Sequence, residues 1–405
     1  MVLKLAQRQR TKEIFTRTVA RDCSLRKSTR REFLALATVG IGAPLRFACI
    51  PLPSAVRNLP LKERMKMLLG PAPSTWLPLD PSKTTRGKEV IDGDVIRQCV
   101  TFNSPDEQGT PIQAYLMRPT VLQKSAPAVL CLHQTDCQKH GKEEAAGVFK
   151  EGDQQCPALK PHPYDSSVMY AKRLAQRGYI TLAPGYYADM SDADYYPLKH
   201  AYSGYFRLNI RHLVRCVDFL ENEKLVAKDR VGCVGHSAGG THALYLSVFD
   251  KRIRVIVSCS GFGTFETYLD ATWVQTAGGS GLRTYMPIID QFYKENKCLP
   301  FEFEEMLPAL APRPLFLSIP LRPQAPPTPR PAKLPDPSDN DRFVYEVLMK
   351  SVDYAKHRYE HLGAGKCIEV LTTEYHEFPT NPVYPSDPAY NFLDKWLHRA
   401  APATT

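Results

Sequence analysis

The 405-residue sequence lacks the patterns of several protein classes. Its eleven cysteines include no Cys-x-x-Cys pair, and no His/Cys spacing suggests a zinc site. There is no internal repeat of the solenoid type. No apolar run approaches the ~20 residues that cross a bilayer. These absences argue against a zinc domain, a repeat array and a stable membrane span.

The excess of positive charge is confined to one end of the chain. The net charge is +10, from 52 Lys and Arg against 42 Asp and Glu. Residues 1–49 hold eleven basic and three acidic residues, which leaves 41 basic and 39 acidic residues, a net +2, for the remainder. Because the body of the chain is nearly neutral, we do not expect nucleic acid as a partner.

The basic N-terminal segment has the features of an export signal. Arg30 and Arg31 are followed by Glu-Phe-Leu and by a mildly apolar stretch over 35–45. A paired-arginine motif before a short apolar region resembles a twin-arginine signal, and the alternative is a basic amphipathic helix with an accidental arginine pair. We expect residues 1–49 to engage the twin-arginine export machinery and the mature protein to be periplasmic or secreted.

The cysteines give little sign of a disulfide framework. Cys131, Cys233 and Cys259 lie inside apolar runs that are typical of buried strands, where cysteine behaves as a small hydrophobic residue. Cys137 and Cys156 bracket a polar loop and form the one pair that would merit a test for a bridge.

The order of predicted elements indicates an α/β fold. Residues 50–90 are rich in proline and without clear periodicity, which indicates a linker or an arm packed on the domain surface. Strands and helices then alternate over 91–400, which predicts a mostly parallel, doubly wound sheet with helices on both faces. The expected strands lie at 95–103, 112–118, 126–133, 179–183, 230–235, 254–260, 314–319 and 367–372. The expected helices lie at 166–177, 206–221, 239–248, 342–362 and 389–399.

Two segments interrupt this alternation. Residues 261–312 are too long for an ordinary connection and contain Trp273, Tyr285 and Phe292, which suits a lid or pocket wall above the sheet. Residues 320–338 carry eight prolines, which predict a surface insertion without helix or central strand.

A candidate nucleophile lies between a predicted strand and a predicted helix. Residues 235–239 read Gly-His-Ser-Ala-Gly, after the apolar run 231–234 and before a helical segment. This strand-turn-helix context is typical of a nucleophile elbow. The sharp turn strains Ser237 and places its hydroxyl at a helix N-terminus, where the dipole favours negative charge. We predict that Ser237 is the nucleophile; the alternative is a serine in a structural turn.

The base and acid of a triad are sought further along the chain. His376 follows the last predicted strand and precedes the final helix, which suits a general base, although it could be an ordinary loop histidine. The acid should follow the strand at 314–319, where Asp336, Asp339 and Asp341 occur and Asp341 and then Asp339 are the candidates. Asp341 is preferred because it begins the predicted helix as an acid and apolar residues follow at Phe343 and Val344, and the unused carboxylate is expected to cap the helix.

Two backbone N–H groups should form the oxyanion hole. Ala238, the residue after the nucleophile, should supply one. The loop after the strand at 126–133 should supply the other, with Thr135 preferred over Gln134. His133 is expected to make a structural hydrogen bond.

The ordered motifs together resemble a known group, the bacterial α/β-hydrolases related to dienelactone hydrolase and acetyl xylan esterase, especially exported members. The matching stretches are 131–135, 141–147, 174–179, 231–240, 249–253 and 311–314. The resemblance implies an α/β-hydrolase fold over about 90–400 and ester hydrolysis by a Ser-His-Asp triad, without a metal or organic cofactor. The sequence departs from this group at the proline insertion and at Glu377, which follows His376 where Asp is usual.

Two other functions remain open. A prolyl-oligopeptidase-like serine peptidase shares the elbow and the triad order, but no propeller-sized domain precedes the catalytic region. A non-catalytic binding protein of the hydrolase fold would result if neither aspartate reached His376. The substrate, a small-molecule or carbohydrate ester, is not specified by the sequence. Six tyrosines could stack on sugar rings, lie plainly on the surface or form a subunit contact: Tyr186, Tyr187, Tyr195, Tyr196, Tyr202 and Tyr205.

Overall fold

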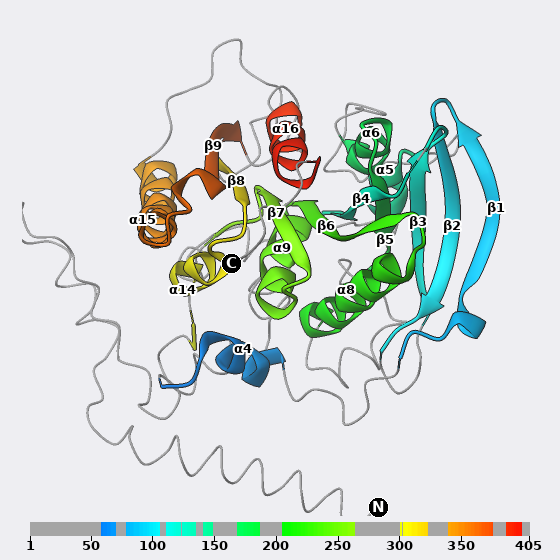
Figure 1. Ribbon diagram of the computed structural model, residues 1–405. Coiled ribbons are helices and arrows are strands. Elements are labelled where there is room, and N and C mark those ends of the chain that lie inside the picture. Colours follow the sequence, from blue (N-terminus) through cyan, green and yellow to red (C-terminus); the bar gives the residue numbers. More distant parts are fainter. Residues whose placement is uncertain are drawn as a thin grey trace, which may run out of the picture.

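The described residues form one nine-stranded sheet covered by helices (Figure 1). The computed structural model describes residues 58–69, 78–105, 111–122, 124–134, 141–148, 168–186, 205–263, 300–301, 303–322, 339–375 and 386–398. The strands are β1 (Thr85–Asp92), β2 (Val95–Asn103), β3 (Pro111–Pro119), β4 (Ala126–Leu132), β5 (Ile180–Pro184), β6 (Val226–His236), β7 (Ile253–Cys259), β8 (Leu315–Arg322) and β9 (Ile368–Tyr375).

The sheet is mostly parallel, as the alternation of strand and helix predicts. Its strand order is β1-β2-β3-β5-β4-β6-β7-β8-β9. The first three strands pair antiparallel with one another and β3 pairs antiparallel with β5, whereas all pairs from β5 to β9 are parallel. Every parallel strand therefore ends at the same edge, which we call the carboxyl edge.

Helices cover both faces of the sheet (Figure 1). One face packs against α4 (Leu61–Leu69), α8 (Tyr205–Asn222), α9 (Ala238–Phe249), α14 (Phe303–Leu310) and α15 (Asp339–His361). The other face packs against α5 (Gly141–Ala146), α6 (Tyr170–Gln176), α16 (Asp387–Leu393) and the π-helix η7 (Asp394–His398). The two short 3-10 helices are η2 (Pro81–Lys83) and η6 (Gly365–Cys367).

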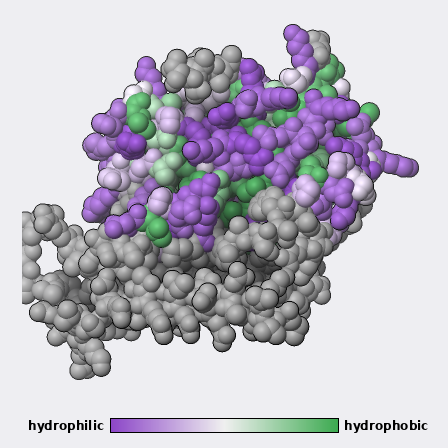
Figure 2. Space-filling view, turned by 60° about the horizontal axis from the view of Figure 1, so that its bottom comes forward, coloured by the Kyte–Doolittle hydropathy of each residue, from purple (hydrophilic) through white to green (hydrophobic). Residues whose placement is uncertain are grey.

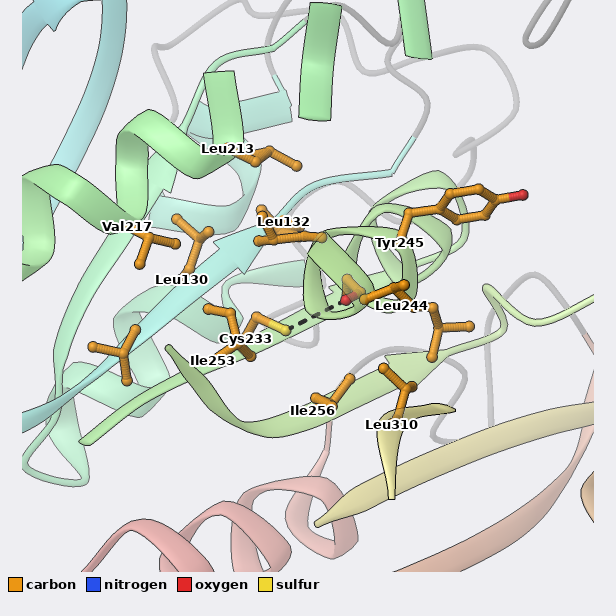
Figure 3. Close-up of a cluster of buried hydrophobic side chains, with 14 of the residues drawn as sticks. Leu130, Leu132, Leu213, Val217, Cys233, Leu244, Tyr245, Ile253, Ile256 and Leu310 are labelled. Atoms are coloured by element: carbon orange, nitrogen blue, oxygen red, sulfur yellow. Dashed lines mark hydrogen bonds between the residues drawn. The ribbon is translucent and has the colours of Figure 1, made fainter. Parts of the chain in front are cut away.

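The centre of the core lies between β4, β6 and the helices α8 and α9. Every residue of β4 is buried, which matches its continuous apolar sequence. Figure 3 shows Leu130 and Leu132 of β4 beside Leu213 and Val217 of α8. Cys233 of β6 lies in the same cluster. The apolar surface removed from water here fixes the two strands that end at the candidate site.

Several elements differ from the sequence expectation. The structure has α4 and β1 within 50–90, the range interpreted as a linker or arm, and α5 was not expected as a helix. Strand β8 continues through Pro320 to Arg322, into the predicted insertion, because the Pro320 position still pairs with Thr373 of β9. The single final helix expected at 389–399 is instead α16 followed by η7.

The three cysteines expected at buried strand positions lie there. Cys131, Cys233 and Cys259 are buried and carry free thiols. The pair Cys137 and Cys156 lies outside the described residues, as do the export signal and Trp273, Tyr285 and Phe292 of the expected lid.

The described surface is largely hydrophilic on the face turned forward in Figure 2, where apolar side chains form small separate areas. Among the described helices, none is both long and apolar enough to cross a membrane.

Candidate functional site

The candidate site lies where the strand order reverses. From β4 the chain moves to β5 on one side and later to β6 on the other, so β4 and β6 are neighbours whose following loops diverge. Such a switch point at the carboxyl edge is where open α/β sheets bind their ligands. Leu132, the last residue of β4, pairs with Gly235, two residues before Ser237. The pairing brings the candidate oxyanion loop and the candidate nucleophile together.

Ser237 occupies a sharp turn between β6 and α9. Its backbone angles are φ 50° and ψ −119°, a conformation that costs a non-glycine residue on the order of 1–3 kcal/mol. Two hydrogen bonds hold the turn: the Ser237 N–H donates to the Cys259 carbonyl at 2.8 Å, and the Ser237 carbonyl accepts from Thr241 N–H at 3.0 Å. The hydroxyl makes no capping bond to α9. The strained turn therefore presents a half-buried Ser237 at the N-terminus of α9.

Helix α9 begins in direct contact with the end of β4. A Cβ at Gly239 would lie 2.0 Å from the Leu132 carbonyl oxygen and 2.6 Å from that of His133. Only glycine allows this approach. The first turn of α9, including Ala238, is thereby held against the loop that contains Gln134.

The loop after β4 has three consecutive carbonyls with defined donors. The Leu132 carbonyl accepts from the Tyr170 hydroxyl at 2.6 Å. The His133 carbonyl accepts from the Tyr186 hydroxyl, and the Gln134 carbonyl accepts from His133 Nδ1 at 2.7 Å. Because each peptide unit is planar, a fixed carbonyl also fixes the direction of the following N–H.

The side chain of Gln134 is turned to a buried acid. Its amide Nε2 donates to a carboxylate oxygen of Glu144 on α5, and both side chains are buried. The side-chain amide nitrogen is thus engaged by Glu144. Gln134 would act in an oxyanion hole through its backbone.

Two buried imidazoles flank the ring of Tyr186. His133 stacks on it with ring centroids 4.0 Å apart, and His242 of α9 lies at 5.0 Å. His242 Nδ1 donates to the Ala238 carbonyl at 2.5 Å, while its Nε2 accepts from Asn209 of α8 at 3.0 Å. Burial lowers the pKa of His242 to about 3, so this imidazole is neutral at physiological pH.

The structure describes the surroundings of the predicted base and acid only in part. His376 lies outside the described residues and follows Tyr375, the last residue of β9. Asp339 and Asp341 both fall in the first turn of α15, of which only the backbone is described there. The helix begins earlier than the expected Arg342. Both aspartates therefore lie inside its first turn. The expectation that one of them caps the helix from the position just before it is wrong, because α15 already begins at Asp339.

Buried hydroxyls at the carboxyl edge lack partners among the described residues. They belong to Ser258 at the end of β7, Ser260 just after it and Thr373 of β9. A buried hydroxyl of this kind is normally satisfied by another polar group or by water. Their position, beside the starts of the loops that follow β7 and β9, marks this edge as polar.

The thiols near the site are poor nucleophiles. Burial raises the pKa of Cys233 and of Cys259 to about 12 in each case, and raises that of Cys131 well above its ordinary value. Because the thiolate is the reactive form, these cysteines stay inert at neutral pH.

Sequence reasoning did not identify Tyr186, His242 or Glu144 as parts of the site. The sequence allows Tyr186 to be a sugar-stacking, surface or subunit-contact residue, but it is 6% exposed and packs inside the molecule. His133 makes the structural hydrogen bonds that were expected of it. Among the described residues, no group of three or more His, Cys, Asp or Glu is arranged to hold a metal ion. Thr135 lies outside the described residues.

Comparisons with known proteins agree with this architecture. Residues 208–278, which include the elbow, match the family model described as BAAT / Acyl-CoA thioester hydrolase C terminal. No curated protein sequence matches the chain.

Solved structures of esterases have a similar fold. A glucuronoyl esterase from Solibacter usitatus has a TM-score of 0.56 at 16% identity, over 82% of this chain and 92% of that one. A glucuronoyl esterase from Teredinibacter turnerae has a TM-score of 0.56 at 17% identity, over 81% and 80%. A Bacteroides fragilis protein to which acetyl xylan esterase activity is ascribed has a TM-score of 0.51 at 17% identity, over 79% and 74%. Together with the strand order and the turn at Ser237, these likenesses show that the chain has the fold of the α/β-hydrolase superfamily.

Proposed function

We propose that the protein is a serine hydrolase of carboxylic esters, with Ser237 as nucleophile. The observation that carries the proposal is the strained turn of Ser237 between β6 and α9, at the switch point of the sheet. A serine held at φ 50° for no purpose would be a net cost to stability, whereas a nucleophile elbow requires this conformation.

The proposed reaction has two halves, and in each half His376 takes up one proton and gives it back. Ser237 Oγ attacks the ester carbonyl carbon while His376 takes the hydroxyl proton. The tetrahedral intermediate collapses, the leaving alkoxide takes that proton from His376, and an acyl-enzyme remains. Water then attacks the acyl carbon while His376 takes its proton. The carboxylic acid is released, and His376 returns the proton to Ser237 Oγ. The N-terminus of α9 lies beside the developing negative charge and stabilises it.

Ala238 N–H and Thr135 N–H are the proposed oxyanion donors. The carbonyl of His133 faces the start of α9, since a Cβ at Gly239 would lie 2.6 Å from that oxygen. The Gln134 N–H shares this planar peptide unit and points the opposite way, away from Ala238. This direction favours Thr135 over Gln134 as the second donor.

Asp341 is the proposed acid, with Asp339 as the alternative. The Tyr345 hydroxyl lies 2.8 Å from Thr372 Oγ1, which places this side of α15 against β9 three residues before its end. Asp341 precedes Tyr345 by four residues and lies on the same side of the helix, one turn nearer the carboxyl edge. Asp339 precedes Tyr345 by six residues, which places it on a different side. The helical period therefore supports Asp341 as the partner of His376.

The substrate class remains a proposal drawn from the relatives. Glucuronoyl esterases have a similar structure, and one similar protein is ascribed acetyl xylan esterase activity, which suggests a carbohydrate ester. The match to an acyl-CoA thioester hydrolase model suggests a second candidate, because a thioester would pass through the same acyl-enzyme. A panel of an acetylated xylo-oligosaccharide, a glucuronic acid methyl ester and an acyl-CoA would separate these classes.

The decisive experiment is labelling with a fluorophosphonate probe, together with hydrolysis of p-nitrophenyl acetate. We expect labelling at Ser237, and Ser237→Ala should lose the label and at least ~10³ in kcat. Ser247→Ala is the matched control, because Ser247 is a buried serine of the same helix whose hydroxyl donates to the Ala243 carbonyl and contacts the Cys233 thiol, inside the core. Unchanged labelling and rate in Ser237→Ala would refute the assignment. Absence of labelling in the folded wild-type protein would favour a non-catalytic binding protein.

A further inference from the structure

Tyr186 lies between the two halves of the proposed oxyanion hole. One half is the loop after β4, which reaches the site through Gln134. The other half is the first turn of α9, which begins at Ala238. Tyr186 follows β5 and belongs to neither of these two segments. It contacts both of them only because the chain is folded.

On the loop side, Tyr186 supports two successive peptide units. Its hydroxyl donates to the His133 carbonyl, which orients the peptide between His133 and Gln134. Its ring stacks on the His133 imidazole at 4.0 Å with an interplanar angle of 19°, and that imidazole donates to the Gln134 carbonyl. The peptide unit after Gln134 carries the N–H of Thr135, the proposed donor.

The imidazole of His133 is in close contact with two neighbours, Gly141 and Tyr186. A Cβ at Gly141 of α5 would lie 2.1 Å from His133 Nδ1 and 2.5 Å from its Cγ, so the helix backbone touches the ring directly. The Tyr186 ring covers the stacked face. Because these two contacts hold the ring, a shift of Tyr186 would let the imidazole turn and would change the direction in which its Nδ1 donates.

On the helix side, Tyr186 contacts the imidazole that holds Ala238. The ring of Tyr186 is tilted by 55° against His242 at 5.0 Å, and His242 Nδ1 donates to the Ala238 carbonyl. His242 is itself fixed by Asn209 of α8. One buried tyrosine thus touches two histidines, and each histidine donates to a backbone carbonyl in one half of the proposed hole.

We propose that Tyr186 is a positioning residue that holds the end of β4 with its following loop, up to Gln134, against the first turn of α9, the two segments from which the oxyanion N–H groups are proposed to come. This inference rests on the proposed esterase function. Tyr186 exchanges no proton with the substrate. It acts because donors aimed at an oxyanion must be held in place before the charge develops, and removal of one such donor lowers kcat by about 10²–10³.

The test compares Tyr186→Phe with a matched tyrosine elsewhere. The substitution keeps the ring between the two histidines and removes only the hydroxyl. Tyr359→Phe is the control: Tyr359 is fully buried, and its hydroxyl donates to the Arg313 carbonyl at 2.7 Å, before β8 and so at the opposite edge of the sheet. Both variants lose one buried bond between a hydroxyl and a carbonyl.

With p-nitrophenyl acetate we expect Tyr186→Phe to lower kcat by about tenfold to a hundredfold, with KM within about twofold, since a displaced donor loses part of its effect. Affinity for phenylboronic acid, which forms a tetrahedral adduct with serine, should fall by a similar factor. The pH profile of kcat should keep its wild-type shape. Tyr359→Phe should be less stable to heat but have wild-type kcat and boronate affinity.

A second pair of variants tests the helix side. His242→Leu removes the donor to the Ala238 carbonyl and should lower kcat in the same way, whereas His242→Gln, whose amide can donate to Ala238 and accept from Asn209, should restore it. Wild-type kcat and boronate affinity in Tyr186→Phe would overturn the inference, whatever the result for His242→Leu. Since Ser237→Ala is measured in parallel, loss of activity there combined with full activity of Tyr186→Phe would reject the positioning role alone.

Discussion

At the scale of single residues, the site contains groups that are unfavourable for stability on their own. Ser237 has a strained backbone, and Glu144 is a buried carboxylate beside Gln134. His242 is an imidazole that must lose its proton to be buried. Such groups persist where the surrounding structure fixes them, and they concentrate at functional sites.

The choice between the two aspartates can be decided by rate and stability together. We expect Asp341→Asn to remain folded and to lose about 10³–10⁴ in kcat, because an amide would hold His376 in the wrong tautomer. Asp339→Asn should keep a nearly normal rate and lose only the ~0.3–1 kcal/mol that an acid contributes in the first turn of α15. Steady-state kinetics and thermal unfolding of both variants provide the comparison. The reverse pattern would assign the role to Asp339.

Burial of His242 predicts a pH dependence of stability. The pKa of this imidazole is lowered from its ordinary value of 6.5 to about 3 in the folded protein. Between these values the unfolded chain binds a proton that the folded chain does not, so the free energy of unfolding falls as the pH drops from about 6.5 toward 3, by up to ~1.4 kcal/mol per pH unit. The stabilising contribution is complete above pH 6.5.

Urea unfolding at several pH values measures this effect. His242→Gln should retain stability near neutral pH and show a shallower decline in acid, because glutamine has no proton to bind. A decline as steep as that of the wild type would mean that His242 is not the group responsible.

At the scale of elements, what could be predicted from sequence depended on whether burial leaves a local pattern. Strand β4 is buried throughout and reads as one apolar run. Strand β1 has no buried residue, so Thr85–Asp92 shows no alternation of polar and apolar side chains. Its strand conformation comes from pairing with β2, which depends on the folded sheet.

The same reasoning applies to the site. The elbow at Ser237 could be predicted because strand, turn and helix are contiguous in sequence. The arrangement around Tyr186 could not, because His133 and Tyr186 are separated by 53 positions and meet only after β4 and β5 have paired. The sequence does not separate the two aspartates as candidate acids, because both lie in the first turn of α15 and a proline-rich insertion precedes that helix.

We predict that helix α4 contributes to the stability of the folded domain and is more than a linker. Met65 is fully buried in the core, and Arg64 donates to both carboxylate oxygens of Glu305 and to the Pro300 carbonyl. Met65→Ala should therefore destabilise the protein by about 2–5 kcal/mol. Lys66→Ala, at the next and exposed position, should change stability by no more than ~0.5 kcal/mol.

Chemical denaturation of both variants tests this expectation. If Met65→Ala were as stable as Lys66→Ala, α4 would contribute nothing to the fold, and the interpretation of 50–90 as a linker or arm would return.

At the scale of the whole molecule, the sheet explains why distant segments supply one site. All the parallel strands end at one edge, so the segments that follow β4, β6, β8 and β9 start there together. Those segments contain, in order, the oxyanion candidates, Ser237, the two aspartates and His376. The chain order of the proposed nucleophile, acid and base is the one typical of this fold, and the sheet supplies the physical reason that segments far apart in the sequence could act as one unit.

The last prediction concerns the chain outside this domain. Most of the net positive charge of the chain lies in residues 1–49, whereas the rest is nearly neutral. Within this segment the paired arginines precede a short apolar stretch. We propose that this segment is a twin-arginine signal. Arg30→Lys combined with Arg31→Lys keeps every charge, so a purely electrostatic role of the segment would survive it. We expect this double variant to remain in the cytoplasm, as measured by cell fractionation and immunoblotting.

Arg21→Lys combined with Arg26→Lys makes the same conservative change outside the motif and should be exported normally. Equal export of both variants would show that the arginine pair is accidental and that the segment is an ordinary basic helix.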